Sequence, residues 1–248
     1  MGSTLVIFDA GTGIRELGED LARRNKATEA GASGLRAHIF ISHLHWDHVQ
    51  GFPFFCPVFV KGNEIHLYGG SGLNGTVRGL LAYQMCSPNF PISLDELEAS
   101  LTFHDLEPGE RVAVDGATVL AESLNHPGGS FGYRLEKDGK VITYASDTEH
   151  GEDADRHMIP LARNADLLIH DSMFTPDQYL GVEDDVSRQS WGHSTWEGAV
   201  ETARAANVKR LVLFHHGNED KIVEEIERRA RVLFPDAIAA YEGLEIEL

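Results

Sequence analysis

The sequence has little cysteine, no long hydrophobic run and no recognisable leader. Two cysteines, Cys56 and Cys86, are too few for a disulfide framework, so we expect free thiols in a reducing cytoplasm. No apolar stretch approaches the roughly 18 residues that a membrane helix needs. The N-terminus also lacks the basic flank and apolar core of a signal peptide. These absences predict a cytoplasmic protein that does not enter a membrane.

Positive charge is scarce too, because 21 Lys and Arg stand against 39 Asp and Glu, a formal net charge of −18. A negative field of this size repels polyanions, so we do not expect a surface that holds long nucleic acid. A small anionic substrate remains compatible, because a bound pair of dications can reverse the local potential. Solubility alone is the other explanation of the charge.

The 248 residues are enough for a buried core, and short apolar runs alternate along them with helical periodicity. We therefore predict one α/β domain, residues 1–248, with stacked sheets and helices outside. The middle, 101–145, reads as hairpins with "KDGK" as a turn, and 86–100 reads as a loop over a site. Strands are predicted at Leu5–Phe8, His38–Ile41, Ile65–Tyr68, Thr118–Ala121, Gly132–Leu135, Val141–Tyr144, Leu167–Ile169 and Leu211–Phe214, and helices at about 14–25, 75–85, 155–163, 195–206 and 219–232.

Histidine, by contrast, is plentiful, and three of the 13 lie in the stretch "IFISHLHWDHVQG", residues 39–51. His43 and His45 are two residues apart, so at a strand end they can point the same way. Asp47 and His48 follow in what should be a turn entering a helix, and can aim at a neighbouring point. The spacing H-x-H-x-D-H therefore indicates two metals rather than one, against the alternative of a solvated histidine-rich loop.

Single candidate ligands recur where other strands end. His126 precedes two glycines, which let the backbone approach closely, while Asp147 and His215 each follow an apolar strand. Alone, each could be a hydrogen-bonded surface residue, but with the first cluster they supply ligands for two ions. Imidazole and carboxylate without thiolate suit Zn²⁺ and also admit Mn²⁺ or Fe. The predicted sets are His43, His45 and His126 for one metal and Asp47, His48 and His215 for the other, with Asp147 shared.

These motifs resemble the metallo-β-lactamase superfamily, from "FDAGTG" at 8–13 to "LVLFHH" at 211–216. Within it the chain is most similar to the phosphodiesterase branch of ribonuclease Z and the PhnP-type cyclic phosphodiesterases. The segments "NHPGGSFGYRLE", "YASDT", "LLIHDSMF" and "GHST…VKRLVLFHH" carry this narrower likeness. The resemblance implies a four-layer αββα sandwich and the same ligand set, with His215 rather than the adjacent His216 as the last ligand.

The resemblance also assigns roles that spacing alone cannot. His193 aligns with the branch's phosphate-binding or proton-donating histidine, although it could also be only a neighbour of a helix cap. Ser194 and Glu197 form an S-x-x-E capping box, which predicts that a helix begins just after His193 and places this imidazole by the helix's positive end. Asp9 resembles a structural aspartate behind the metal loop, and Asp171 is expected to hold His193 or a ligand imidazole.

The chain also departs from these relatives. Only 20 residues separate His126 from Asp147, where common ribonuclease Z carries a tRNA-gripping arm, so tRNA 3′ processing is not expected. Relatives usually have a further strand pair before "DAGTG", and this chain starts almost on that segment. A shorter sheet edge would put the usual substrate wall and dimerisation in doubt.

The expected function is hydrolysis of a small or cyclic phosphodiester by a hydroxide shared between two metals. His193 would stabilise the phosphoryl oxygens or protonate the leaving group, and Asp47 would orient the nucleophile as well as bind metal. A lactonase, β-lactamase or thioesterase on the same metals is the first alternative. A redox diiron protein and a non-catalytic binding module are the others, and a homodimer stays open by analogy with relatives.

Overall fold

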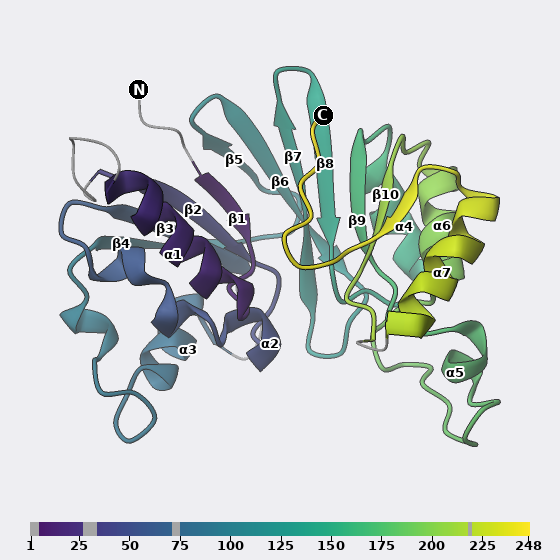
Figure 1. Ribbon diagram of the computed structural model, residues 1–248, viewed down its shortest axis with the longest axis horizontal. Helices are drawn as coiled ribbons and strands as arrows, with labels where there is room; N and C mark the ends of the chain where they lie inside the picture. Colours follow the sequence, from purple (N-terminus) through teal and green to yellow (C-terminus); the bar gives the residue numbers. More distant parts are fainter. Residues whose placement is uncertain (1–4, 27–33, 71–74, 218–219) are drawn as a thin grey trace. The chain divides into compact units, whose positions relative to one another are not determined.

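The computed structural model describes residues 5–26, 34–70, 75–217 and 220–248, and the chain divides into two compact units. Unit 1 is Met1–Glu107 and unit 2 is Pro108–Leu248, and each is built on its own sheet (Figure 1). The single domain expected from the sequence stays a prediction. Among the described residues, no helix combines the length and the apolar character that crossing a membrane requires.

Unit 1 has a parallel sheet in the order β1-β2-β3-β4. Its strands alternate in the usual way, so that neighbouring side chains point to opposite faces. One face carries Ile39, Ile41, Ile65 and Leu67, which pack with Leu81 and other residues in a buried apolar cluster. The elements are β1 (Leu5–Phe8), α1 (Gly13–Lys26), β2 (Arg36–Ile41), α2 (Trp46–Val49), β3 (Glu64–Gly70), α3 (Val77–Gln84) and β4 (Ser100–Leu106), with short 3-10 helices at Phe52–Phe54, Cys56–Phe59 and Leu94–Glu96.

Unit 2 has a mixed sheet in the order β11-β10-β9-β8-β7-β6-β5. Strands β5 to β8 pair antiparallel, whereas β8 to β11 pair parallel, and α4, α6 and α7 pack on the sheet through the second apolar cluster (Figure 1). The elements are β5 (Arg111–Val114), β6 (Ala117–Leu124), β7 (Ser130–Lys137), β8 (Lys140–Ala145), α4 (Glu152–Ala162), β9 (Leu167–Asp171), α5 (Pro176–Leu180), α6 (Trp196–Ala205), β10 (Leu211–Phe214), α7 (Asp220–Leu233) and β11 (Ala237–Ala239).

Parallel pairing of β8, β9 and β10 decides where the polar residues of unit 2 meet. Carboxyl ends of parallel strands lie at one edge of a sheet, and ligands commonly bind there. Asp171 is the last residue of β9, His215 follows β10 directly, and Asp147 lies two residues beyond β8. The topology thus brings three chain segments, distant in sequence, to the same edge.

Every strand and helix predicted from the sequence is present: β1 and β10 have the predicted ends, the others have shifted ends, and position 219 of the predicted helix 219–232 lies outside the described residues. The middle segment was assigned wrongly in part. The expected hairpins begin only at β5, and "KDGK" is the β7–β8 turn, with Asp138 and Gly139 at positive φ. Residues 100–106 instead form β4, which pairs in parallel with β3 in unit 1. The segment 86–100 was expected to be a loop, and it carries one 3-10 helix, Leu94–Glu96.

Candidate metal centre and catalytic residues

A buried aspartate organises the metal loop of unit 1. Asp9 follows β1, and its carboxylate accepts hydrogen bonds from the Ser42 amide (2.6 Å) and the Ser42 hydroxyl (2.8 Å). It also accepts one from His48 Nδ1 at 2.7 Å. The carbonyl of His48 in turn accepts from the Ala10 amide at 2.7 Å. Asp9 therefore fixes both ends of the segment that carries the four candidates, which is the structural role predicted for it.

Contacts with neighbouring side chains orient the imidazole rings of this segment. Because His48 Nδ1 donates to Asp9, its Nε2 keeps the lone pair that a metal needs. His43 Nδ1 lies 3.1 Å from the Ser42 hydroxyl, and His43 Nε2 lies 2.8 Å from His45 Nδ1. Two imidazole nitrogens at this distance aim at a common region. Their pairing is what the H-x-H spacing predicted.

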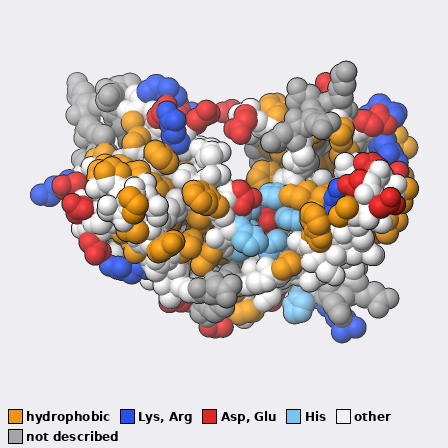
Figure 2. Space-filling view, turned by 90° about the horizontal axis from the view of Figure 1, so that it is seen from below, with side chains coloured by type: hydrophobic (Ala, Val, Ile, Leu, Met, Phe, Trp, Pro, Cys, Tyr) orange, Lys and Arg blue, Asp and Glu red, His pale blue; other side chains and the backbone are white. Residues whose placement is uncertain are grey.

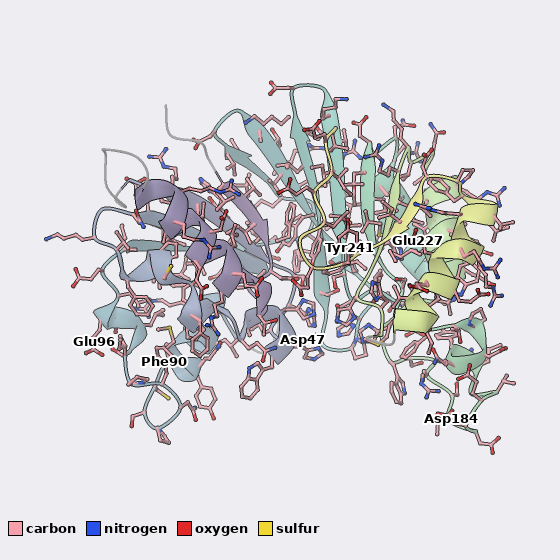
Figure 3. All side chains as sticks on the ribbon, viewed as in Figure 1. Asp47, Phe90, Glu96, Asp184, Glu227 and Tyr241 are labelled. Atoms are coloured by element: carbon pink, nitrogen blue, oxygen red, sulfur yellow. The ribbon has the colours of Figure 1, made fainter. Side chains whose placement is uncertain are left out.

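Asp47 differs from the imidazoles around it. It lies in the first turn of α2, where Figure 3 labels it, and its side chain is 56% exposed while that of His48 is 4% exposed. Its Oδ2 lies 3.2 Å from His48 Nε2. The predicted pairing of Asp47 with His48 is therefore present inside unit 1.

Close packing of two turns holds the metal loop against the "DAGTG" segment. A Cβ on Gly11 would lie 2.4 Å from the Asp47 carbonyl oxygen, and one on Gly51 would lie 1.9 Å from the Gly11 carbonyl oxygen. No side chain larger than hydrogen fits without moving backbone. The "DAGTG" glycine is thus explained by a contact with the metal loop.

In unit 2, four candidate donor groups converge at the sheet edge. One ligand atom from each of Asp147, Asp171, His193 and His215 lies within 4.8 Å of the other three. His215 Nε2 is 3.4 Å from Asp147 Oδ1, and the rings of His193 and His215 stack at 5.1 Å. The Ser146 hydroxyl donates to Asp147 Oδ1 at 2.6 Å. This convergence joins two predicted ligands to the predicted catalytic histidine.

Asp171 orients His193. Its carboxylate is fully buried and accepts from His193 Nδ1 at 2.7 Å, from the Ser194 amide at 3.0 Å and from the Met173 amide at 3.1 Å. With its proton on Nδ1, a neutral His193 presents Nε2 as an acceptor, and a protonated His193 presents it as a donor. Of the two roles predicted for Asp171, holding His193 is the one its hydrogen bonds show.

The predicted capping box next to His193 is wrong. The N-cap of α6 is Thr195, whose hydroxyl accepts from the Gly198 amide, and the helix begins at Trp196. Ser194 instead donates its hydroxyl to the Thr148 carbonyl at 2.6 Å. This tertiary bond takes Ser194 away from the helix, so the position of His193 depends on Asp171 more than on the helix terminus.

His126 is set by a backbone carbonyl. Its Nδ1 lies 2.9 Å from the Gly192 oxygen, and because a carbonyl only accepts, Nδ1 carries the proton and Nε2 the lone pair. The ring also meets that of His193 edge-on at 5.3 Å. Gly192 has φ +88°, and a Cβ there would lie 2.3 Å from His126 Nδ1. Only glycine can make this approach.

His216 has a different environment from His215. Its Nε2 lies 2.8 Å from the Ala240 carbonyl oxygen, a bond in which the imidazole must be the donor. A nitrogen that donates to a carbonyl cannot bind a metal at the same time. The contact favours His215 as the ligand, as expected from the sequence.

Two residues that the sequence did not single out also belong to these groups. Ser42 bonds to Asp9 and reaches both His43 and His48, and Glu149 binds the segment that precedes His193. Ser42 could have been suspected from its place between a strand and the first histidine. Glu149 gives no such signal, because its partners come from distant loops.

The donor set fits divalent cations. It consists of imidazole nitrogens and carboxylate oxygens, and Nδ1 of three imidazoles, on His48, His126 and His193, contacts a carboxylate or carbonyl. Such outer partners orient metal-binding histidines and raise their basicity. His193 and His215 keep 13% and 17% of their side-chain surface exposed, and Figure 2 shows histidine side chains reaching the molecular surface.

Comparison with known proteins now gives the class. The family described as the beta-lactamase superfamily domain matches residues 4–216, and the chain belongs to this family. Its named relatives include ribonuclease Z, which belongs to the phosphodiesterase branch that the sequence resembles, and they support a metal-dependent phosphoric diester hydrolase. The α/β fold of the metallo-β-lactamase type is confirmed by the same family match and by the two sheets.

Individual relatives are similar over most of their length. Ribonuclease Z of Bacillus velezensis is 25% identical, over 84% of this chain and 80% of the relative. Human tRNase Z, short form, is 26% identical with a TM-score of 0.62, over 86% of this chain and 82% of that one. A diphosphatase from the PhnP family has a TM-score of 0.68 at 20% identity, over 98% and 79% of the two chains.

Proposed function

We propose that the protein is a binuclear metal-dependent phosphodiesterase that acts on small or cyclic phosphodiesters. The observation that carries this proposal is the convergence of Asp147, Asp171, His193 and His215 at one edge of the unit 2 sheet, with His193 held by a buried carboxylate. A structural ion pair would not need a second histidine stacked on the first. A phosphodiesterase needs metal ligands and a proton carrier side by side.

The proposed ligand set has seven members. His43, His45 and His126 would hold one divalent cation, Asp47, His48 and His215 the other, and Asp147 would be shared. Zn²⁺ is the first choice for nitrogen and oxygen donors, with Mn²⁺ and Fe as alternatives. The local support is the orientation of three of these imidazoles: Ser42 contacts His43, Asp9 contacts His48 and the Gly192 carbonyl contacts His126.

When bound, two such cations lower the pKa of a water molecule to supply the nucleophile and stabilise charge on the phosphoryl oxygens. His193 supplies the proton. Its Nδ1 donates to Asp171, so in the imidazolium form Nε2 is the atom that donates to a phosphoryl oxygen or to the leaving alkoxide. General acid catalysis of this kind contributes about 10²–10⁴-fold. Asp47, which is exposed, would help to orient the nucleophile.

The named relatives and the net charge both bear on the substrate. The relatives are named for ribonuclease activity, which makes RNA a candidate and weakens the expectation that long nucleic acid is excluded. The net charge of −18 still favours a substrate that requires only a short anionic contact. Cyclic nucleotides, cyclic ribose phosphates and short RNA ends meet this condition.

The test is hydrolysis of bis(p-nitrophenyl) phosphate by the purified protein, with added Zn²⁺ or Mn²⁺ and with a chelated control. Metal-dependent turnover is expected, and a 3′-extended RNA and a cyclic nucleotide should then be compared under the same conditions. Turnover of lactones or thioesters, with none of any phosphodiester by the fully metallated protein, would make the carbonyl hydrolase alternative the better account.

A further inference from the structure

Glu149 is a buried carboxylate to which the mechanism above gives no role. It is only 7% exposed, and its side chain accepts three hydrogen bonds. The Tyr179 hydroxyl donates to Oε1 at 2.6 Å, the Ser190 amide to Oε1 at 2.7 Å and the Gly192 amide to Oε2 at 2.9 Å. A carboxylate with this many donors is costly to bury unless its position matters.

The main chain of Glu149 is tied to a second segment. Its amide donates to the Asn125 carbonyl at 2.8 Å, and the Asn125 side-chain amide donates back to the Glu149 carbonyl at 3.2 Å. Asn125 directly precedes His126. One residue therefore connects the turn after β8, the turn that carries His126 and the segment that leads into His193.

Gly192 is where these connections meet the candidate ligands. Its amide donates to Glu149 Oε2, while its carbonyl accepts from His126 Nδ1. The missing side chain is needed, because a Cβ would collide with the His126 ring at 2.3 Å. The Gly192 amide and carbonyl belong to successive peptide units joined at one Cα, so the bond from the amide to Glu149 restrains where the carbonyl points, and that carbonyl decides which nitrogen of His126 carries the proton.

We infer that Glu149 is a positioning residue for the proposed metal centre. It fixes the Gly192 peptide, so that His126 is held as the Nδ1–H tautomer with Nε2 as the donor atom, and it keeps His193 within reach of Asp171. This inference rests on the proposed function for its catalytic meaning, but the tautomer of His126 is a property of the metal-free protein.

The donors around Glu149 decide the choice of variants. Tyr179 and Ser190 donate to Oε1 and Gly192 donates to Oε2, so both side-chain oxygens of Glu149 must accept, whereas a glutamine side chain would turn an NH₂ group toward at least one donor. Tyr179 acts as a donor because burial and its hydrogen bond with Glu149 raise the pKa of its phenol. Glu149→Gln should therefore disturb the Gly192 peptide. Tyr179→Phe should not, because Ser190 and Gly192 still donate to Glu149.

The experiment compares Glu149→Gln with Tyr179→Phe, as the matched control, in metal-free protein. The ring nitrogens of His126 are followed by ¹⁵N NMR, with His126→Ala to assign the signal, and Zn²⁺ affinity is measured by calorimetry. Wild type and Tyr179→Phe should show a single Nδ1–H tautomer. Glu149→Gln should show a tautomer mixture and a Zn²⁺ affinity weaker by about 10–100-fold, the range found for outer partners of metal ligands.

Glu149→Asp covers the case in which Glu149→Gln does not fold, because it keeps the charge and shortens the reach by one methylene. It should shift the same two readouts in the same direction. An unchanged His126 tautomer and unchanged Zn²⁺ affinity in a folded Glu149 variant would overturn the inference. If the wild type binds Zn²⁺ but hydrolyses no phosphodiester, the proposed function fails, and the tautomer and affinity readouts still decide the role of Glu149.

Discussion

The two units present their candidate ligands in opposite ways. Unit 1 places four of them within six residues, His43 to His48, in the segment that follows β2 and enters α2. Unit 2 collects Asp147, Asp171 and His215 from the ends of three neighbouring parallel strands, with His193 from the loop before α6. Ligands that are contiguous in the sequence can be recognised there as a motif. The residues of unit 2 are far apart in the sequence and come together only when the sheet forms.

The buried carboxylates Asp9 and Asp171 differ in the same way: Asp9 contacts one short segment, whereas Asp171 connects distant segments. Asp9 serves the loop itself, because its partners Ser42 and His48 belong to one turn. Asp171 joins the end of β9 to His193, 22 residues further on. We therefore expect substitutions in unit 1 to act on metal affinity, and substitutions in unit 2 to separate metal affinity from proton transfer.

The largest expected effect on activity is the difference between alanine variants of the adjacent residues His215 and His216. His215→Ala removes a proposed ligand and should lower kcat/KM for bis(p-nitrophenyl) phosphate by about 10³-fold, since metal ions supply several kcal/mol to such transition states. His216→Ala removes only a bond to the Ala240 carbonyl and should keep its activity. Steady-state kinetics and metal content measure both. Equal losses in the two variants would contradict the assignment.

Asp171→Asn should separate catalysis from metal binding. An asparagine can present its NH₂ group to His193 Nδ1, which removes the acceptor that orients the ring and holds the Nδ1 proton, so kcat should fall by about 10²-fold while bound metal stays near the wild-type value. Loss of metal in step with kcat would mean that Asp171 supports a ligand rather than a proton carrier.

Asp9→Asn tests the corresponding carboxylate of unit 1. His48 would lose the acceptor that fixes its tautomer, so metal affinity should weaken by about 10–100-fold. Saturating metal should restore most of kcat, which sets this variant apart from Asp171→Asn. Titration of the metal-free protein with Zn²⁺, followed by activity at saturation, is the measurement. A kcat that stays low at saturation would remove the distinction between the two units.

The smallest effect is expected away from both groups. Asp166 accepts from Lys209 Nζ (2.7 Å) and from the Val141 amide (2.8 Å), and these bonds lower the pKa of its carboxyl. A lowered folded-state pKa means that the stabilisation is present above the unfolded value, about 4, and is lost as the pH falls through the folded-state pKa. Asp166→Asn should reduce the free energy of unfolding by about 1 kcal/mol at pH 7, because the lysine is 72% exposed and contributes little.

Denaturant unfolding at pH 7 and at pH 3 checks this last prediction. The difference between wild type and variant should shrink at the lower pH, and phosphodiesterase activity at pH 7 should not change. A variant that loses activity without losing stability would show that the β8–β9 connection also serves the catalytic residues.

The sequence predicted the structure best where a single short segment determines the feature. H-x-H-x-D-H predicted the pairing of His43 with His45, and apolar runs predicted β8 and β10, whose ends carry Asp147 and His215. It went wrong at Ser194, because both Ser194 and Thr195 can cap a helix and a tertiary bond to Thr148 decides between them. Local sequence does not contain that bond.

The same limit explains the residues that were missed. Gly192 looks like any loop glycine until the His126 ring is placed beside it, and Glu149 looks like a surface acid until three donors surround it. The residues of β4 were expected to form part of a hairpin, because their half-buried pattern fits a hairpin as well as a parallel edge strand. Each error concerns a partner distant in sequence.

Three of the strand-end residues share an unusual backbone. Asp9, Asp147 and His215 have φ of 62°, 54° and 54°, in the left-handed region that only Gly, Asn, Asp and, less readily, His adopt with ease. Evolution or engineering that sought another metal preference at these positions would face a backbone restriction as well as a chemical one. Cysteine or glutamate would each cost about 1–2 kcal/mol in conformation alone, so the backbone already disfavours a thiolate ligand at 215 before the metal is considered.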